Sequence, residues 1–136
     1  MTYVFIAIAA IVLGVILWVL IHSGWRFARP LNRHYFERKW LELLARVKTH
    51  DGMILSVIDA DKLLDEALKR RGYKGRTMGE RLVAAQRVLS NNDGVWFAHK
   101  LRSRLVHEPE VRLKKSEAKD ALAAIKQSLI DLGALQ

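Results

Sequence analysis

The first feature of the hydrophobic pattern is an uninterrupted apolar run from Tyr3 to Ile21, YVFIAIAAIVLGVILWVLI. As an α-helix these nineteen residues measure about 28 Å, close to the roughly 30 Å hydrocarbon core of a bilayer. A cleaved signal peptide and a buried core helix are the alternatives, but a signal peptide has a basic start and a shorter apolar core. We therefore expect residues 1–25 to form a retained transmembrane anchor that contacts the lipid bilayer through residues 3–21.

The charges that follow this run predict its orientation. All 23 Lys and Arg residues lie from Arg26 onward, and five of them fall within residues 26–39. Basic flanks stay on the cytoplasmic side of a membrane, so we expect the amino terminus outside and the rest of the chain in the cytoplasm. The expected localisation is the cell membrane, as a single-pass protein with a cytoplasmic C-terminal domain.

Beyond Pro30 the apolar positions become periodic. Within residues 26–50 they recur at the spacing of one helix face, at Phe36, Trp40, Leu43, Leu44 and Val47. The opposite face is charged, which predicts a basic amphipathic helix beside the membrane. Such a helix lies on anionic headgroups or packs on the following domain, and the two glutamates that dilute its basic face favour packing.

The remainder, residues 51–136, contains four helical stretches, at 53–71, 78–89, 94–108 and 116–132. The expected caps are Asp51, Thr77 with Glu80 as a capping box, and Asn92 or Asp93. The expected stops are Gly72, Pro109 and Gly133. No alternating strand pattern is present, and the connections are short. The predicted fold class is therefore all-α, with the transmembrane helix and the juxtamembrane helix followed by an antiparallel four-helix bundle.

The amino-acid composition limits which disulfides, metal sites and cofactor sites this bundle can contain. The chain of 136 residues has no cysteine, which excludes disulfides and thiolate metal sites. None of its five histidines lies three or four residues from another, so we expect no metal site. We also expect no cofactor, because the glycines near residue 72 follow a helix rather than the strand that precedes a phosphate-binding loop.

The net charge of +9 predicts an anionic partner. The stretch KRRGYKGR places five basic residues between the first two bundle helices, namely Lys69, Arg70, Arg71, Lys74 and Arg76. Anionic lipid and RNA are both candidate partners for these residues. A solvated basic loop without a ligand is the alternative.

Two charged residues interrupt the expected core. Asp61 falls inside the apolar stripe of the first bundle helix, and Arg102 falls inside that of the third. A buried charge is tolerated only when it is paired, so we expect Arg102 to form a salt bridge with Asp61, or with Asp65 as the second candidate. His99 lies three residues before Arg102 and is placed to join this network.

The stretch HKLRSRLVHEP, residues 99–109, sets Arg102 and His107 on either side of four residues at the end of the third bundle helix. This arrangement resembles the HEPN superfamily, whose ribonuclease members use such a pair in a site built across a dimer. With IDADKLLDEALKRRGYKGRTMGERL, the region of about residues 40–132 is also similar to small bacterial single-pass membrane proteins with a HEPN-like cytosolic part.

The resemblance implies a homodimeric, metal-independent endoribonuclease. His107 would act on the attacking 2′-hydroxyl or the leaving oxygen, and Arg102 would stabilise the charge of the scissile phosphate. The two residues are five apart, about 140° around an ideal helix, so they share a face only if the last turn unwinds. The chain also departs from active members at Ser103, where they usually carry Asn, Asp or His, and at Pro109, where they often carry Tyr.

A purely structural interpretation competes with catalysis. In it Arg102 is a salt-bridge partner and His107 caps carbonyl groups at a helix end. We therefore expect a membrane-tethered HEPN-like interaction or scaffolding module, with a membrane-localised endoribonuclease using Arg102 and His107 as the alternative. A ligand sensor at the membrane is a third reading that the sequence neither favours nor excludes.

Overall fold

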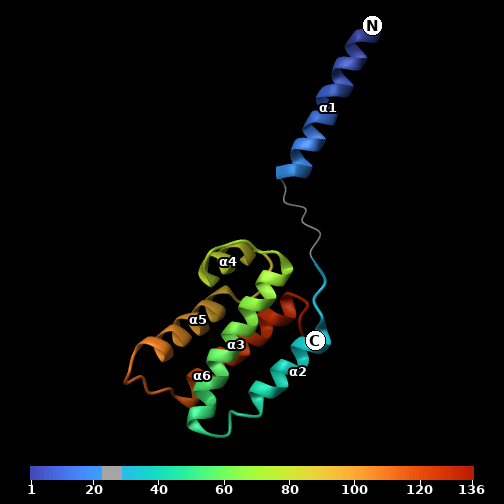
Figure 1. The fold of residues 1–136 in the computed structure, drawn as a ribbon. Helices are drawn as coiled ribbons and strands as arrows, with labels where there is room; N and C mark the ends of the chain where they lie inside the picture. Colours follow the sequence, from blue (N-terminus) through green and yellow to red (C-terminus); the bar gives the residue numbers. More distant parts are fainter. Residues whose placement is uncertain (23–28) are drawn as a thin grey trace.

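A computed structural model describes residues 1–22 and 29–136 of the chain (Figure 1). These residues form six α-helices and no strand, which confirms the all-α prediction for this part of the chain. The helices are α1 (Thr2–His22), α2 (Arg33–Leu44), α3 (His50–Arg71), α4 (Met78–Ala85), α5 (Asn92–His107) and α6 (Lys115–Asp131). The predicted boundary between residues 25 and 26 lies outside the described residues.

The helix α1 corresponds to the apolar run. Its window Thr2–Val19 has a mean hydropathy of 2.6, and none of it is buried against the rest of the protein. Among the described residues, α1 contacts no other helix, and Figure 1 shows it as a separate rod. By length and composition, α1 is able to cross a membrane.

The helix α2 belongs to the core of the bundle. Three of its apolar residues, Phe36, Trp40 and Leu43, are buried and pack along α3. The Oγ atom of Ser56 on α3 lies 2.7 Å from the carbonyl oxygen of Leu43, which joins the end of α2 to α3. The apolar face of this helix therefore covers the bundle, and the described residues before position 51 share one core with residues 51–136.

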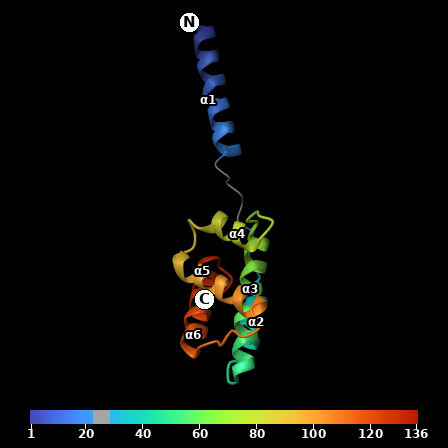
Figure 2. The ribbon, with the colours of Figure 1, turned by 90° about the vertical axis from the view of Figure 1, so that its left-hand side faces the viewer.

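The helix α3 is the centre of the bundle and contacts α2, α4, α5 and α6 (Figures 1 and 2). It is consequently buried on several sides, with an inner surface that includes Val57, Ala60, Leu64, Ala67 and Leu68. Small alanines on this surface allow neighbouring helices to approach closely. The helices α5 and α6 pack against α3 and against each other, through Val95, Ala98, Leu101, Ala121, Ile125 and Leu129.

The helix α4 is shorter than predicted. It ends at Ala85 instead of residue 89, and a turn follows. The side-chain amide of Asn92 donates hydrogen bonds to the carbonyl oxygens of Gln86 and Leu89. These two carbonyl groups therefore have hydrogen-bond partners although the helix does not continue. Figure 1 shows α4 at the end of the bundle where α3 ends.

Several predicted caps differ from the observed ones by one or two residues. Thr49 caps α3 instead of Asp51, and Asn91 caps α5 instead of Asn92 or Asp93, because their side chains accept the backbone N–H three residues later. Thr77 caps α4 as predicted, but the carboxylate of Glu80 accepts from the N–H of Arg76 and not from that of Thr77.

The predicted end of α3 is confirmed. Gly72 has a φ of 91°, and its N–H donates to the carbonyl oxygen of Lys69. The next N–H, that of Tyr73, donates to Leu68. Because this left-handed conformation strains any residue with a side chain, glycine fixes the turn at residue 72.

Candidate functional site

Asp61 lies at the centre of the polar cluster that the sequence singled out. Asp61 is only 3% exposed, and its carboxylate faces α5. The Nδ1 atom of His99 is 3.0 Å from one carboxylate oxygen and 3.2 Å from the other. An ionised carboxylate only accepts hydrogen bonds, so Nδ1 of His99 carries the proton in this contact.

Arg102 joins the same cluster from the next turn of α5. Its Nε atom lies 3.6 Å from Oδ2 of Asp61, close enough for an ion pair, but it makes no hydrogen bond among the described residues. The Arg102 side chain is 28% exposed. Arg102 therefore lies at the edge of the core and not inside it, and His99 is the nearer partner of the buried carboxylate.

Asp65 has a different partner from the one the sequence suggested. Arg81 on α4 donates two hydrogen bonds to it, at 2.7 Å and 3.0 Å, and Nζ of Lys69 lies 2.9 Å away. Burial raises the pKa of the Asp65 carboxyl, but the hydrogen bonds and charges of Arg81 and Lys69 outweigh this effect and hold the pKa below its ordinary value.

Arg81 was missed by the sequence analysis. Arg81 is 6% exposed and lies on the same side of α4 as the buried residues Met78, Leu82 and Ala85. A charge at helical spacing within such a stripe is the signal that singled out Asp61 and Arg102, and applied to residues 78–85 it would have found Arg81 too.

His107 is the last residue of α5 and is exposed. The helix stays regular up to this point, since the N–H of Glu108 donates to the carbonyl oxygen of Arg104 at 2.9 Å. The last turn thus does not unwind, and Arg102 and His107 keep the angular separation of about 140° expected for a regular helix. Among the described residues, no contact joins the two side chains.

The five basic residues predicted to bind anions divide into three groups by their side-chain partners. Lys69 and Arg70 pair with carboxylates one turn earlier on α3, those of Asp65 and Glu66. Arg71 donates to the carbonyl oxygen of Arg29 at 3.1 Å. Lys74 and Arg76 are exposed, and neither side chain has an ion-pair or hydrogen-bond partner among the described residues.

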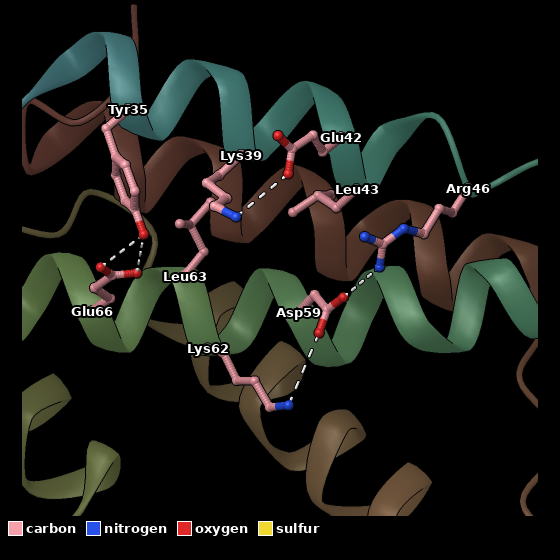
Figure 3. Close-up of a pocket in the computed structure, with 9 residues that line it drawn as sticks. All are labelled: Tyr35, Lys39, Glu42, Leu43, Arg46, Asp59, Lys62, Leu63 and Glu66. Carbon is pink, nitrogen blue, oxygen red and sulfur yellow. Dashed lines mark hydrogen bonds and ion pairs between the residues drawn. The ribbon is translucent and has the colours of Figure 1, made fainter.

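A polar groove between α2 and α3 pairs its charges internally (Figure 3). Arg46 of the α2–α3 connection lies 2.7 Å from Asp59 on α3, and the hydroxyl of Tyr35 donates to Glu66 at 3.0 Å. Lys39 lies 3.5 Å from Glu42 on the same helix. Each carboxylate in Figure 3 thus faces a cation or a hydroxyl group, so the groove offers little uncompensated charge to a ligand.

A second depression is apolar and lies between the connection that follows α2 and the first turns of α6. It is lined by five apolar residues and two lysines, namely Leu44, Val47, Met53, Ala118, Leu122, Lys115 and Lys119. An apolar hollow on the surface of a bundle is a common feature of protein contact sites.

Comparisons of the chain with protein-family models, with curated proteins and with solved structures find no match. The HEPN relationship therefore stays a prediction, and a function is inferred from the geometry of the polar clusters and from α1.

Proposed function

We propose that the protein is a membrane-tethered helical interaction or scaffolding module of HEPN-like fold. In this proposal α1 spans the membrane and the bundle works on the cytoplasmic side by binding and not by catalysis. The observation that carries the proposal is the contact of Arg102 with the buried Asp61. This contact gives the arginine of the Arg-x4-His motif a structural role.

Catalysis of RNA cleavage without metal needs a histidine and an arginine that face one scissile phosphate. Arg102 already lies 3.6 Å from a carboxylate, which offsets the positive charge that a phosphate would require. His107 projects from a different side of the same regular helix. This arrangement favours a structural role for Arg102 over a catalytic role for the pair.

The membrane part of the proposal is supported by the length, hydropathy and exposure of α1. The orientation is supported by the basic residues that follow it, beginning at Arg26. The apolar depression beside Met53 supports binding as the mode of action, since it leaves apolar side chains accessible on the surface of the bundle.

Cleavage of RNA separates this proposal from its alternative. The full chain, purified in mild detergent, is incubated with mixed RNA in EDTA, beside the His107→Ala variant and Lys48→Ala as a matched surface control. We expect no cleavage by any of the three proteins. Cleavage by the wild type and the Lys48 variant that disappears in a folded His107→Ala protein would establish the endoribonuclease and contradict the scaffold proposal.

Retention of α1 is tested separately. We expect the full-length mass of the mature protein in the membrane fraction, resistant to alkaline carbonate extraction, and no labelling of Lys39 or Lys48 by an impermeant amine reagent in intact cells. A shortened protein in the soluble fraction would show that residues 1–22 belong to a cleaved signal. Labelled lysines would show that the orientation is the opposite of the proposed one.

A further inference from the structure

A depression at the C-terminal end of α3 gathers five basic side chains from three parts of the chain. They are Arg29, Lys69, Arg71, Lys74 and Arg81. The remaining lining residues are Tyr73 and two glycines, so the depression contains no carboxylate. It differs in this respect from the groove of Figure 3, where acidic and basic residues alternate.

Most of this positive charge is not compensated. Asp65 is not a lining residue of the depression, but its carboxylate pairs with both Arg81 and Lys69. Arg29, Arg71 and Lys74 have no carboxylate within ion-pair distance among the described residues, and the buried Nε atom of Arg71 has no hydrogen-bond partner there. The depression therefore retains a net positive charge that attracts an anion.

The loop that forms the depression is fixed in place. Nη1 of the buried Arg81 donates to the carbonyl oxygen of Gly75 at 2.6 Å. A Cβ atom at Gly75 would lie 2.9 Å from the backbone nitrogen of Arg81, so the loop approaches α4 more closely than another residue would allow. The basic residues are thus held on a defined surface, which lowers the entropic cost of binding an anion.

The covalent chain limits how far this depression lies from α1. His22 ends α1, and Arg29, which lines the depression, follows seven residues later. Seven residues span at most about 25 Å. The N–H donated by Arg71 to the Arg29 carbonyl oxygen ties the chain to the end of α3 at the same place. When α1 is in a bilayer, this end of the bundle is therefore held near its surface.

We propose that the depression binds the phosphate group of an anionic lipid headgroup, in the bilayer that α1 spans. The inference rests on the proposed membrane insertion of α1 and adds a ligand to it. Lipid is favoured over RNA by the short tether and by the shape of the site. Single-stranded RNA is usually held along a groove with several aromatic platforms, whereas this is one depression with Tyr73 as its single aromatic side chain.

The test uses the full chain in nanodiscs of neutral phosphatidylcholine and in nanodiscs that also contain anionic phosphatidylglycerol. The rate of acetylation of Lys74 is measured by mass spectrometry relative to that of Lys48, which is exposed at the other end of α3, a helix about 33 Å long. We expect the Lys74 rate, relative to Lys48, to fall at least about threefold in anionic discs. An equal ratio in the two discs would overturn the proposal.

Two adjacent arginines provide a matched pair of variants. Arg71→Gln removes a side chain from the depression, whereas Arg70→Gln makes the same charge change at a residue that pairs with Glu66 outside it. We expect protection of Lys74 to be lost in the first variant and kept in the second. Arg29→Gln, which leaves the carbonyl contact to Arg71 intact, serves as a second variant if Arg71→Gln does not fold. Equal protection in all variants would indicate a general surface potential and overturn the site.

Further experiments test other ligands and separate failure of the headgroup site from failure of the membrane anchor. Inorganic phosphate or a short RNA is added to the neutral discs, and we expect neither to protect Lys74 as the anionic lipid does. Equal protection by either one would replace lipid with that ligand. Failure of the chain to enter nanodiscs of both compositions would contradict the membrane anchor itself, whereas entry without protection would leave the anchor standing and remove the headgroup site.

Discussion

Arg81 donates two hydrogen bonds to the carboxylate of Asp65, at 2.7 Å and 3.0 Å, and so joins α4 to the central helix α3. Its third contact, with the carbonyl oxygen of Gly75, fixes the loop between the two helices. Because the backbone of α4 lies close to that of α3 and to that of no other helix among the described residues, this arginine is a main determinant of where α4 lies.

Removal of Arg81 should therefore be costly. Arg81→Ala leaves Asp65 with only the more exposed Lys69, and we expect a loss of about 3 to 5 kcal/mol in the free energy of unfolding. Urea titration of the full chain in mild detergent, followed by circular dichroism, measures it. Arg87→Ala, an exposed control nearby, should change stability by less than about 0.5 kcal/mol. Equal, small losses in both variants would show that the pair is not buried in solution.

The Asp61 cluster predicts unequal effects for its members. Asp61→Ala removes a buried carboxylate and leaves His99 and Arg102 facing each other, so we expect a loss of about 3 to 5 kcal/mol. Arg102→Ala leaves Asp61 hydrogen-bonded to His99, and we expect a smaller loss of about 1 to 2 kcal/mol. The same urea titration compares them, and a larger loss for Arg102 than for Asp61 would contradict this ranking.

Packing of α2 on the bundle is tested by two residues of that helix. Phe36 is fully buried, so Phe36→Ala should lower the free energy of unfolding by about 3 to 5 kcal/mol through the lost burial and the cavity left behind. Leu41→Ala on the same helix, where the side chain is 66% exposed, should change it by less than about 0.5 kcal/mol. If the two variants behave alike, α2 does not belong to the core.

Acid should destabilise the bundle through Asp65 and Asp131. Burial raises the pKa of each carboxyl, but hydrogen bonds outweigh it, from Arg81 and Lys69 to Asp65 and from Ser90 and Gln127 to Asp131, so both folded-state pKa values lie below the ordinary 3.8. A lowered pKa stabilises the folded state above the unfolded pKa, and this contribution is lost as the pH falls through 3.8 toward the folded value.

Urea midpoints between about pH 5 and pH 3 measure this effect. We expect the midpoint to fall with acidification in the wild type and to fall less steeply in Asp65→Asn. Asp93→Asn, at an exposed position, is the control and should keep the wild-type slope. A slope in Asp65→Asn identical to that of the wild type would show that Asp65 does not contribute to acid sensitivity.

The sequence by itself determined the features that depend on neighbours along the chain. The apolar run of residues 3–21 predicts α1, Gly72 ends α3, and Thr77 caps the start of α4. These signals are local, because a cap or a stop satisfies backbone groups within about one helical turn of itself. Periodicity also placed Asp61 and Arg102 toward the core, since the helix period decides which residues share a face.

The tertiary structure alone decided which charges meet and which helices share the core. His99 is the closest partner of Asp61, and Arg81 pairs with Asp65. The helix α2 packs on α3, whereas α4 is shorter than predicted. Each outcome depends on how α3 is surrounded by four neighbours at once. The helix pattern sets the direction of a side chain, but the partner it reaches is set by the relative rotation and offset of two packed helices, which the pattern of neither helix contains.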